Sequence, residues 1–269
     1  MKLSVTAGLA AVMTLAASVL CAQTASLPRD AAGHPDLNGT WDNGSGIDFL
    51  KPQHLEGGSI CVSGCEAPRA AAKTGTPPPA GARPPRNYPQ YKAEYLAKVA
   101  ELEKNQLKFD PVLHCRSPGL PRIGPPDKIV QQSGQIVFLY DDVSGDFFRI
   151  VPTDGRPHRK DVDPSTLGDS IGHWEGDTLV VEANQFNDDS WLTDNGAFHS
   201  VELTVTERLW RVGDTLKYEA VATDPKVLME PWKVTRTAKL TDVDLVEATP
   251  CIDKDLNHVV DGTHHDNPR

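Results

Sequence analysis

The sequence lacks the motifs that most strongly indicate nucleotide binding or a zinc enzyme. The stretch "GHWEGD" (172–177) does not have the glycine spacing of a phosphate-binding loop. No HExxH sequence and no close His-x-His pair occurs in the chain. We therefore expect no metal and no cofactor.

Positive charge is also scarce. Lysine and arginine together number 27 against 37 aspartates and glutamates, and the net charge is −10. An acidic surface repels phosphate backbones, so we expect no nucleic-acid partner. Beyond the first residues no segment is apolar enough to span a bilayer, and we expect no membrane insertion of the mature chain.

The N-terminus has the pattern of a secretory signal peptide. Met1-Lys2 provides a positive start, residues 3–20 are almost wholly apolar or small, and the chain then turns polar. We predict a signal peptide over 1–22 and a periplasmic or secreted location. A membrane anchor and lipidation at Cys21 remain alternatives, although Leu20 occupies the place where a lipidated cysteine normally follows a small residue.

Removal of the signal peptide leaves four cysteines, an even number that indicates disulfides in an exported chain. Cys61 and Cys65 flank the flexible turn "VSG", which leaves Cys115 to pair with Cys251. That second bridge closes a long loop and is worth roughly 4 kcal/mol by chain entropy. The "CVSGC" spacing also suits zinc, but no second cysteine pair completes such a site.

The first third of the chain is predicted to carry little regular structure apart from one helix. Residues 23–86 are an extended Gly/Pro-rich segment that includes "TGTPPPAGARPPR" (74–86). An amphipathic helix is expected over 87–108, because Tyr91, Tyr95, Val99 and Leu102 recur at helical spacing. A proline-rich strap, "HCRSPGLPRIGPP" (114–126), follows it, and 253–269 reads as a flexible tail.

From Lys128 onward the sequence predicts eight or nine strands separated only by turn residues. Strands without intervening helices are antiparallel neighbours. We therefore predict a mainly β protein, an antiparallel meander over 109–252 that closes into a barrel.

Alternation of residue types assigns the faces of two of these strands, and in 232–240 one face carries Trp232, Val234, Arg236, Ala238 and Leu240. Over 199–209 the inward face is expected to carry His199, Val201, Leu203, Val205, Glu207 and Leu209. A buried charge needs a partner, so we expect an ion pair of Glu207 with Arg236 on a nearby strand. His199 and Glu207 would lie about 27 Å apart on one strand, at opposite ends of the barrel.

Several motifs together resemble a family of exported bacterial proteins of unassigned function. They are "PDLNGTW", "HCRSPGLPR", "FRIVPTDGRPH", "SIGHWEGDTLVVEANQFNDDSWLTDNGAFHS", "VTERLWR" and "DPKVLMEPW", which cover most of residues 35–251. The resemblance implies export and a common fold, but it does not indicate a particular reaction or substrate. Arg159 and His173 depart from it, since the family usually has proline and arginine there. "GTW" (39–41) is also similar to the Gly-x-Trp of lipocalins, which favours a lipocalin-like barrel.

The loop "DGRPH" (154–158) supplies the first candidate site residues. Asp154 precedes a glycine, so its carboxylate can simply cap a turn. The functional interpretation makes His158 and His199 proton carriers, Asp154 their orienting group and Arg156 an anion anchor. His158 also has a simpler interpretation as a solvent-facing residue.

The turn "HWEGDT" (173–178) supplies the second group, in which His173, Trp174, Glu175 and Asp177 are candidate substrate-binding residues. The competing interpretation is a charged hairpin turn with a packed tryptophan. Convergence of His158, His173 and His199 on a zinc ion is a third possibility.

These features favour an exported enzyme whose barrel binds a small apolar or aromatic molecule. Metal-independent acid–base chemistry by histidine and carboxylate would make it a lyase, an isomerase or a hydrolase. The alternatives are a non-catalytic periplasmic carrier or sensor with the same pocket, and a His-ligated zinc enzyme.

Overall fold

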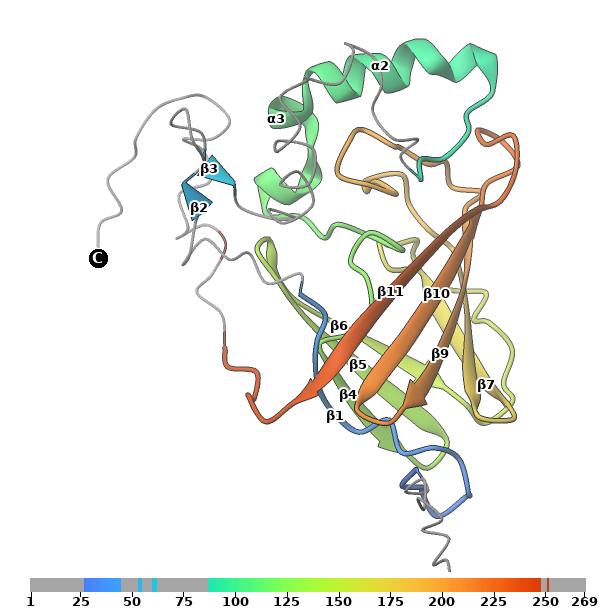
Figure 1. Cartoon of the computed structure of the whole chain (residues 1–269). Helices are drawn as coiled ribbons and strands as arrows, with labels where there is room; N and C mark the ends of the chain where they lie inside the picture. The colour runs from blue at the N-terminus through green and yellow to red at the C-terminus, as the bar shows by residue number, and fades with distance from the viewer. Residues whose placement is uncertain (1–26, 45–52, 55–59, 62–86, 248–250, 252–269) are drawn as a thin grey trace, which may run out of the picture.

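A computed structural model describes residues 27–44, 53–54, 60–61, 87–247 and 251. They form mainly antiparallel β structure with a few short helical segments (Figure 1). The main sheet contains β1 (Gly39–Asp42), β4 (Lys128–Gln132), β5 (Gln135–Asp142), β6 (Gly145–Pro152), β7 (Asp169–Glu175), β8 (Thr178–Asn184), β9 (Thr204–Val212), β10 (Thr215–Thr223) and β11 (Trp232–Thr241). A separate pair consists of β2 (Gln53–His54) and β3 (Ile60–Cys61).

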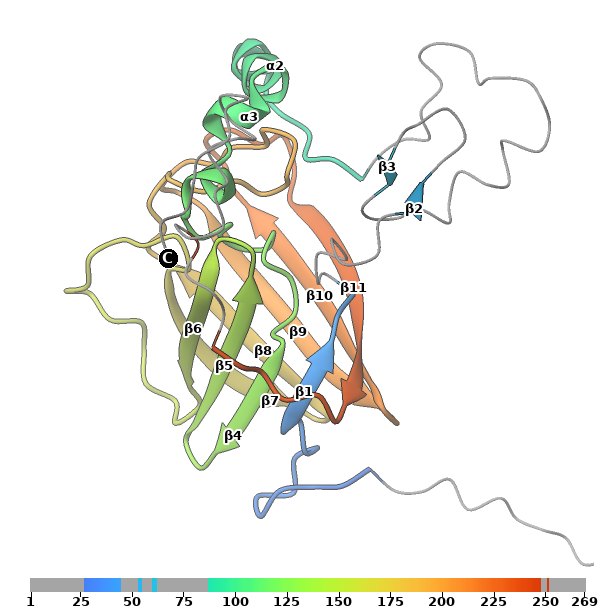
Figure 2. The same ribbon diagram turned by 90° about the vertical axis from the view of Figure 1, so that its left-hand side faces the viewer.

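The main sheet curls into a nearly closed barrel (Figure 2). The strand order is β6-β5-β4-β1-β11-β10-β9-β8-β7, and neighbouring strands are antiparallel. The two end strands approach within 8 Å between Cα atoms, yet they are not neighbours in the described sheet. We call the gap between β6 and β7 the seam. The predicted antiparallel, barrel-like sheet is confirmed.

An odd number of antiparallel strands makes the two strands at the seam run in the same direction. Two parallel strands cannot be joined by a tight turn and need a longer crossover connection. Residues 153–168 provide it. They begin beside the β4–β5 turn, where Asp154 lies close to Gly134, and return along the outside of the barrel to pair Ser165 with Phe186 (Figure 2).

β1 comes from the segment that the sequence analysis placed before the barrel, so the barrel begins earlier in the chain than residue 109. Trp41 on this strand is fully buried and donates its indole N–H to Leu37 O at 3.0 Å. Gly39 has a φ of +136°, and a Cβ atom there would lie 2.7 Å from Leu240 Cδ1. A side chain at this position would force the Leu240 side chain to move, and the positive φ would strain any residue other than glycine.

The region predicted as one helix over 87–108 is helical only in its later part. It contains the 3₁₀ turn η2 (Ala93–Tyr95), α2 (Leu96–Lys104) and α3 (Gln106–Phe109), and the 3₁₀ turn η3 (Pro111–His114) follows. Before Ala93 the chain is extended, because Lys92 N donates to Val227 O and Met229 N donates to Gln90 O. These tertiary bonds replace the first turns of the predicted helix.

The predicted strand over 199–209 is wrong at its beginning, because β9 starts at Thr204. The carboxylate of buried Asp224 accepts hydrogen bonds from Ser200 N at 2.6 Å and Ser200 Oγ at 2.9 Å. These bonds fold residues 200–203 into a turn. Further along, Val205, Glu207 and Leu209 are buried as alternation predicts.

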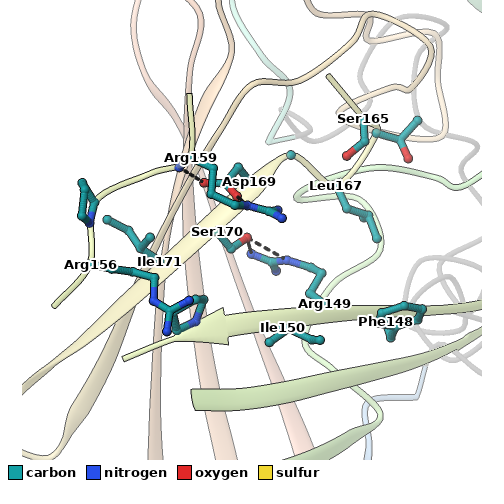
Figure 3. Close-up of a pocket in the computed structure, with 14 residues that line it drawn as sticks. Phe148, Arg149, Ile150, Arg156, Arg159, Ser165, Leu167, Asp169, Ser170 and Ile171 are labelled. Carbon is teal, nitrogen blue, oxygen red and sulfur yellow. Dashed lines mark hydrogen bonds and ion pairs between the residues drawn. The ribbon is translucent and has the colours of Figure 1, made fainter. Parts of the chain in front are cut away.

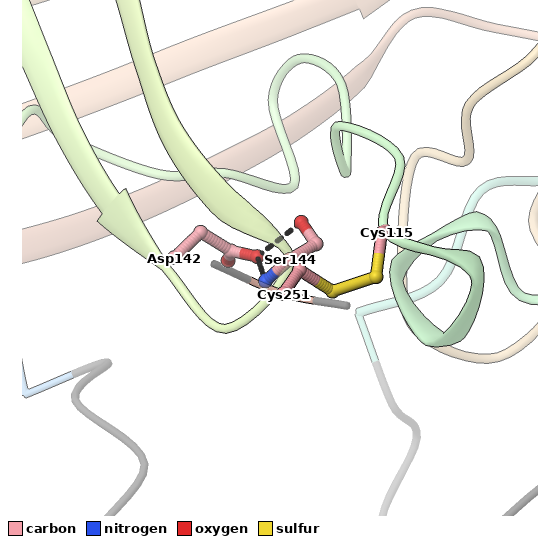
Figure 4. Close-up of a disulfide and its surroundings, with 4 residues drawn as sticks. All are labelled: Cys115, Asp142, Ser144 and Cys251. Carbon is pink, nitrogen blue, oxygen red and sulfur yellow. Dashed lines mark hydrogen bonds between the residues drawn. A yellow bond between two sulfur atoms is a disulfide. The ribbon is translucent and has the colours of Figure 1, made fainter. Parts of the chain in front are cut away.

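The predicted disulfide between Cys115 and Cys251 is present (Figure 4). It joins the chain after η3 to the chain beyond β11, beside the β5–β6 turn in which Ser144 N and Oγ donate to Asp142 Oδ1. The Cys61–Cys65 pairing involves a residue outside the described ones. The predicted signal peptide, the 74–86 stretch and the tail after 252 also fall outside them. No helix within the described ranges has the length and apolar character that a membrane crossing requires.

Candidate ligand-binding groove at the barrel seam

A groove of about 460 Å³ lies over the seam, between β6, the start of β7 and the connection 153–168 (Figure 3). We call it the seam groove. Its apolar lining includes Phe148 and Ile150 of β6, which are 66% and 51% exposed, together with Leu167 and Ile171. Its polar lining is Arg149, Arg156, Arg159, Ser165, Thr166, Asp169 and Ser170.

The alternation of β6 explains this lining. Arg149 and Val151 point into the barrel, whereas Phe148 and Ile150 point outward. Because β6 ends the sheet, no further strand packs against these two outward side chains. The seam groove therefore lies on the outer surface. Large side chains are buried in the protein core, among them Trp41, Phe138, Tyr140, Phe186 and Tyr218. The barrel was expected to bind its ligand, but the seam groove lies outside the barrel.

A buried polar cluster forms the floor of the seam groove. Arg149 Nη2 lies 2.6 Å from Glu207 Oε2, and Tyr218 OH donates to Glu207 Oε1 at 3.0 Å. Arg149 also donates to Tyr140 OH at 3.0 Å and to Ser170 Oγ at 2.8 and 3.2 Å. The contact of Arg149 with Glu207 Oε2 is an ion pair in which both side chains are buried. We call these five residues the Arg149 cluster.

The Arg149 cluster corrects the predicted ion pair between Glu207 and Arg236. Glu207 is opposite Ala220 in β10, whereas Arg236 of β11 is opposite Tyr218. The two residues are therefore two strands and two rungs apart, and half-buried Arg236 packs beside Gly124. Burial would lower the pKa of Arg149, but the charges and hydrogen bonds of Glu207 and Tyr140 together outweigh burial and raise that pKa, which keeps the guanidinium charged.

Ser170 lies in "GDSIG" (168–172), which has the Gly-x-Ser-x-Gly spelling of a hydrolase nucleophile elbow. That elbow is a sharp turn between a strand and a helix. Ser170 instead lies within β7, which continues to Glu175, and its hydroxyl accepts hydrogen bonds from Arg149. The surroundings of Ser170 are those of a cluster member rather than a nucleophile.

The carboxylate beside His158 is Asp169, not Asp154 as predicted. His158 Nδ1 lies 3.0 Å from Asp169 Oδ2, and Asp169 is only 3% exposed. Arg159 supplies the remaining partners, its main-chain N at 3.0 Å and its Nε at 2.6 Å. Burial would raise the pKa of Asp169, but the hydrogen bonds from Arg159 and His158 outweigh burial and lower it. A proline at 159 could not donate the main-chain bond, because proline has no backbone N–H.

Asp154 and Arg156 form their own pair at the start of the connection. Arg156 Nε lies 2.9 and 3.0 Å from the two carboxylate oxygens, and its Nη2 lies 2.5 Å from Asp154 Oδ2. The hydrogen bond from Arg156 is the main cause that lowers the pKa of Asp154 to about 2. Both side chains are substantially exposed, so this pair adds little stability. Its effect is to hold the Arg156 side chain at the edge of the seam groove.

The residues of the "HWEGDT" turn lie at the far end of β7 and outside the groove lining. His173 Nε2 lies 3.3 Å from Glu175 Oε1, and Arg208 Nη2 lies 2.6 Å from Glu175 Oε2. Trp174 stacks on His34 with ring centroids 4.6 Å apart, and Asp177 forms a bidentate pair with Arg29. Gly176, with a φ of +59°, permits the two-residue hairpin turn. These contacts favour the structural interpretation of the turn.

His199 is 1% exposed and has a partner on each ring nitrogen. Its Nε2 lies 2.9 Å from Ser190 Oγ and its Nδ1 lies 3.0 Å from Ser200 O. The carbonyl can only accept, so Nδ1 carries the proton and Nε2 accepts from the serine hydroxyl. Burial lowers the pKa of His199, which keeps the ring neutral. A structural role explains these contacts without proton transfer.

His158, His173 and His199 thus have separate partners, and no three metal-ligating side chains gather among the residues that the structure describes. The alternative in which the three imidazoles converge on a zinc ion is therefore not supported by the described residues.

Because His199 is buried, we expect it to make the free energy of unfolding depend on pH. Its folded-state pKa lies below the unfolded value of 6.5, so the unfolded chain binds more protons below that pH. This contribution is complete above pH 6.5 and declines as the pH falls, by at most about 1.4 kcal/mol per pH unit. Urea unfolding between pH 7.5 and 5 should show a weaker pH dependence for His199→Gln than for wild type. His173→Gln, at an exposed position, is the control and should keep the wild-type slope.

The chain matches no model of a known protein family, and no curated protein sequence matches it. Its function is therefore inferred from the seam groove and the residues around it.

Proposed function

We propose that the protein is an exported, lipocalin-like barrel that binds a small apolar or aromatic molecule in the seam groove. The observation that carries the proposal is the pair of outward apolar side chains, Phe148 and Ile150, exposed on an end strand and facing a hollow. Exposed apolar patches beside a concave site with a few fixed polar groups are typical of ligand sites. Export is supported by the Cys115–Cys251 disulfide and by the predicted signal peptide.

The Arg149 cluster supports the proposal by holding the groove floor in place. Its members come from β5, β6, β7, β9 and β10, so the side chains under the seam are fixed from most of the barrel. A rigid floor lowers the entropy that a ligand must overcome on binding.

A catalytic version of this function is favoured by one observation, the pair of His158 with buried Asp169. The carboxylate holds one ring nitrogen, and Nε2 of His158 makes no hydrogen bond to the residues that the structure describes. A histidine held in this way can transfer protons. Pro157 and Arg159, the neighbours of His158, both line the groove. His158 is thus the candidate acid–base group of a lyase, isomerase or hydrolase, with Asp169 as its positioning residue.

The proposed function is tested by titrating purified protein with N-phenylnaphthylamine, an uncharged dye that fluoresces in apolar sites. The variant Phe148→Ser/Ile150→Ser should bind the dye at least about tenfold more weakly, because two apolar side chains are lost from the groove. Val201→Ser/Met229→Ser, at exposed apolar positions away from the seam, is the matched control. Equal affinities for wild type and the Phe148/Ile150 variant would contradict the proposal.

Native mass spectrometry of freshly purified protein then separates a carrier from an enzyme. A carrier retains an unmodified molecule, and His158→Gln should retain it equally. An enzyme should convert the captured compound, and His158→Gln should slow that conversion by at least about a hundredfold.

A further inference from the structure

We infer that the ligand of the seam groove is an organic monoanion, with an acid group bound by Arg159 and Arg156 and an apolar body lying on Phe148 and Ile150. This inference rests on the proposed function and specifies the class of ligand for the same groove.

The first support is the surplus of hydrogen-bond donors at the groove rim. Asp169 engages only Nε of the Arg159 side chain, and both terminal nitrogens of Arg159 make no hydrogen bond within the described part of the chain. Arg156 uses Nε and Nη2 on Asp154, which leaves Nη1. The two side chains are 65% and 59% exposed, so these donors are open to a ligand.

The second support is that the carboxylates paired with these two arginines already accept hydrogen bonds. Asp169 accepts from His158 and from two Arg159 nitrogens, and Asp154 accepts from the main chain and side chain of Arg156. Glu207 is buried beneath the floor. The groove therefore offers the planar fork of the two terminal nitrogens of Arg159, which can bind an oxyanion bidentately, and one further nitrogen of Arg156, with little carboxylate surface to bind a cation.

The third support is the arrangement of these donors relative to the apolar lining. Figure 3 shows Arg156 and Arg159 on the connection and Phe148 and Ile150 on β6, across the groove from them. A molecule that contacts both sides must have an acid group at one end and an apolar body at the other. Each arginine is already paired with one carboxylate, so the rim has open N–H donors but no surplus positive charge to balance a second negative charge on the ligand.

The proposal also explains how an acidic protein can take up an anion. The net charge is −10, so most of the surface repels such a ligand. Paired arginines at the groove create a local region where an anion is not repelled. Binding should weaken as salt rises, because the rim arginines are exposed to screening.

The test compares anilinonaphthalene sulfonate with N-phenylnaphthylamine, two dyes that share one aromatic body and differ in the acid group. Wild type should bind the sulfonate at least about tenfold more tightly, since a charge-assisted hydrogen bond is worth that ratio. Arg159→Gln should remove this preference, lowering affinity for the sulfonate about tenfold and leaving the uncharged dye within about twofold. Lys160→Gln, which removes a neighbouring charge outside the groove lining, should behave as wild type.

Competition identifies the acid group. Displacement of the sulfonate dye by decanoate but not by decanol or inorganic phosphate indicates a carboxylate with an apolar tail. Equal binding of the two dyes by wild type, or an equal loss of both in Arg159→Gln, overturns the inference while leaving the proposed function standing. Failure of the Phe148→Ser/Ile150→Ser variant to weaken either dye overturns both.

Discussion

Replacing Glu207 with alanine is expected to destabilise the protein by about 3–5 kcal/mol, because it leaves the Arg149 guanidinium buried without its counter-ion. The side chains of Arg149 and Glu207 are 3% and 0% exposed, so water cannot take the place of the lost carboxylate. The same change removes the acceptor of the buried Tyr218 hydroxyl. Urea unfolding at pH 7.5 measures the loss, and Glu202→Ala, on the exposed turn before β9, should change stability by less than about 0.5 kcal/mol.

The double variant Arg149→Met/Glu207→Leu distinguishes a missing counter-ion from a missing contact. Replacing both charges by apolar side chains of similar size removes the desolvation penalty of each. The double variant should therefore be more stable than Glu207→Ala. The single variants Arg149→Met and Glu207→Leu complete the comparison. If the double variant loses as much free energy of unfolding as the two single variants lose together, the two residues are not coupled. A loss below about 1 kcal/mol in Glu207→Ala would contradict the burial of the charge.

Removing the disulfide by Cys115→Ser/Cys251→Ser is expected to lower the free energy of unfolding by about 3–5 kcal/mol. The bridge spans a sequence separation of 136, and loop closure of that length removes much entropy from the unfolded chain. The result should appear as a lower urea midpoint. Dithiothreitol should lower the midpoint of wild type by a similar amount and should leave that of the double variant nearly unchanged. A variant as stable as wild type would contradict this role of the bridge.

The strand pattern was predictable because side chains alternate with a period of two. The faces of β9 and β11 follow directly from it, and Val205, Glu207 and Leu209 lie inside as expected. The beginning of β9 was not predictable in this way. The residue types from His199 to Leu203 continue the alternation. However, Ser200 donates two hydrogen bonds to Asp224, more than twenty residues away, and the chain turns there instead of continuing as a strand.

The partner of Glu207 depends on the register of strands that are distant in sequence. Alternation places both Glu207 and Arg149 inside, but only the curl of the sheet brings β6 near β9 across the barrel. The seam itself depends on β1, a four-residue strand whose addition makes the strand count odd.

One sequence pattern indicates the seam groove, although alternation alone did not predict the groove. In "DFFRIVP" (146–152) apolar residues occupy both faces of one strand, and a strand covered on one side has no need of that pattern. Asp169 left a weaker signal, a carboxylate at the first residue of β7. The importance of Arg159 was not visible, because its main-chain bond to Asp169 exists only once residues 153–168 have crossed the seam.

The crossover of residues 153–168 also divides the molecule in an unusual way. On its N-terminal side lie β1, β4, β5 and β6, and on its C-terminal side lie the remaining five strands of the barrel. A protease cut after exposed Lys160 would interrupt the chain without breaking any strand ladder. The two fragments would stay associated through the pairing of β1 with β11. The disulfide between Cys115 and Cys251 would also keep them covalently linked.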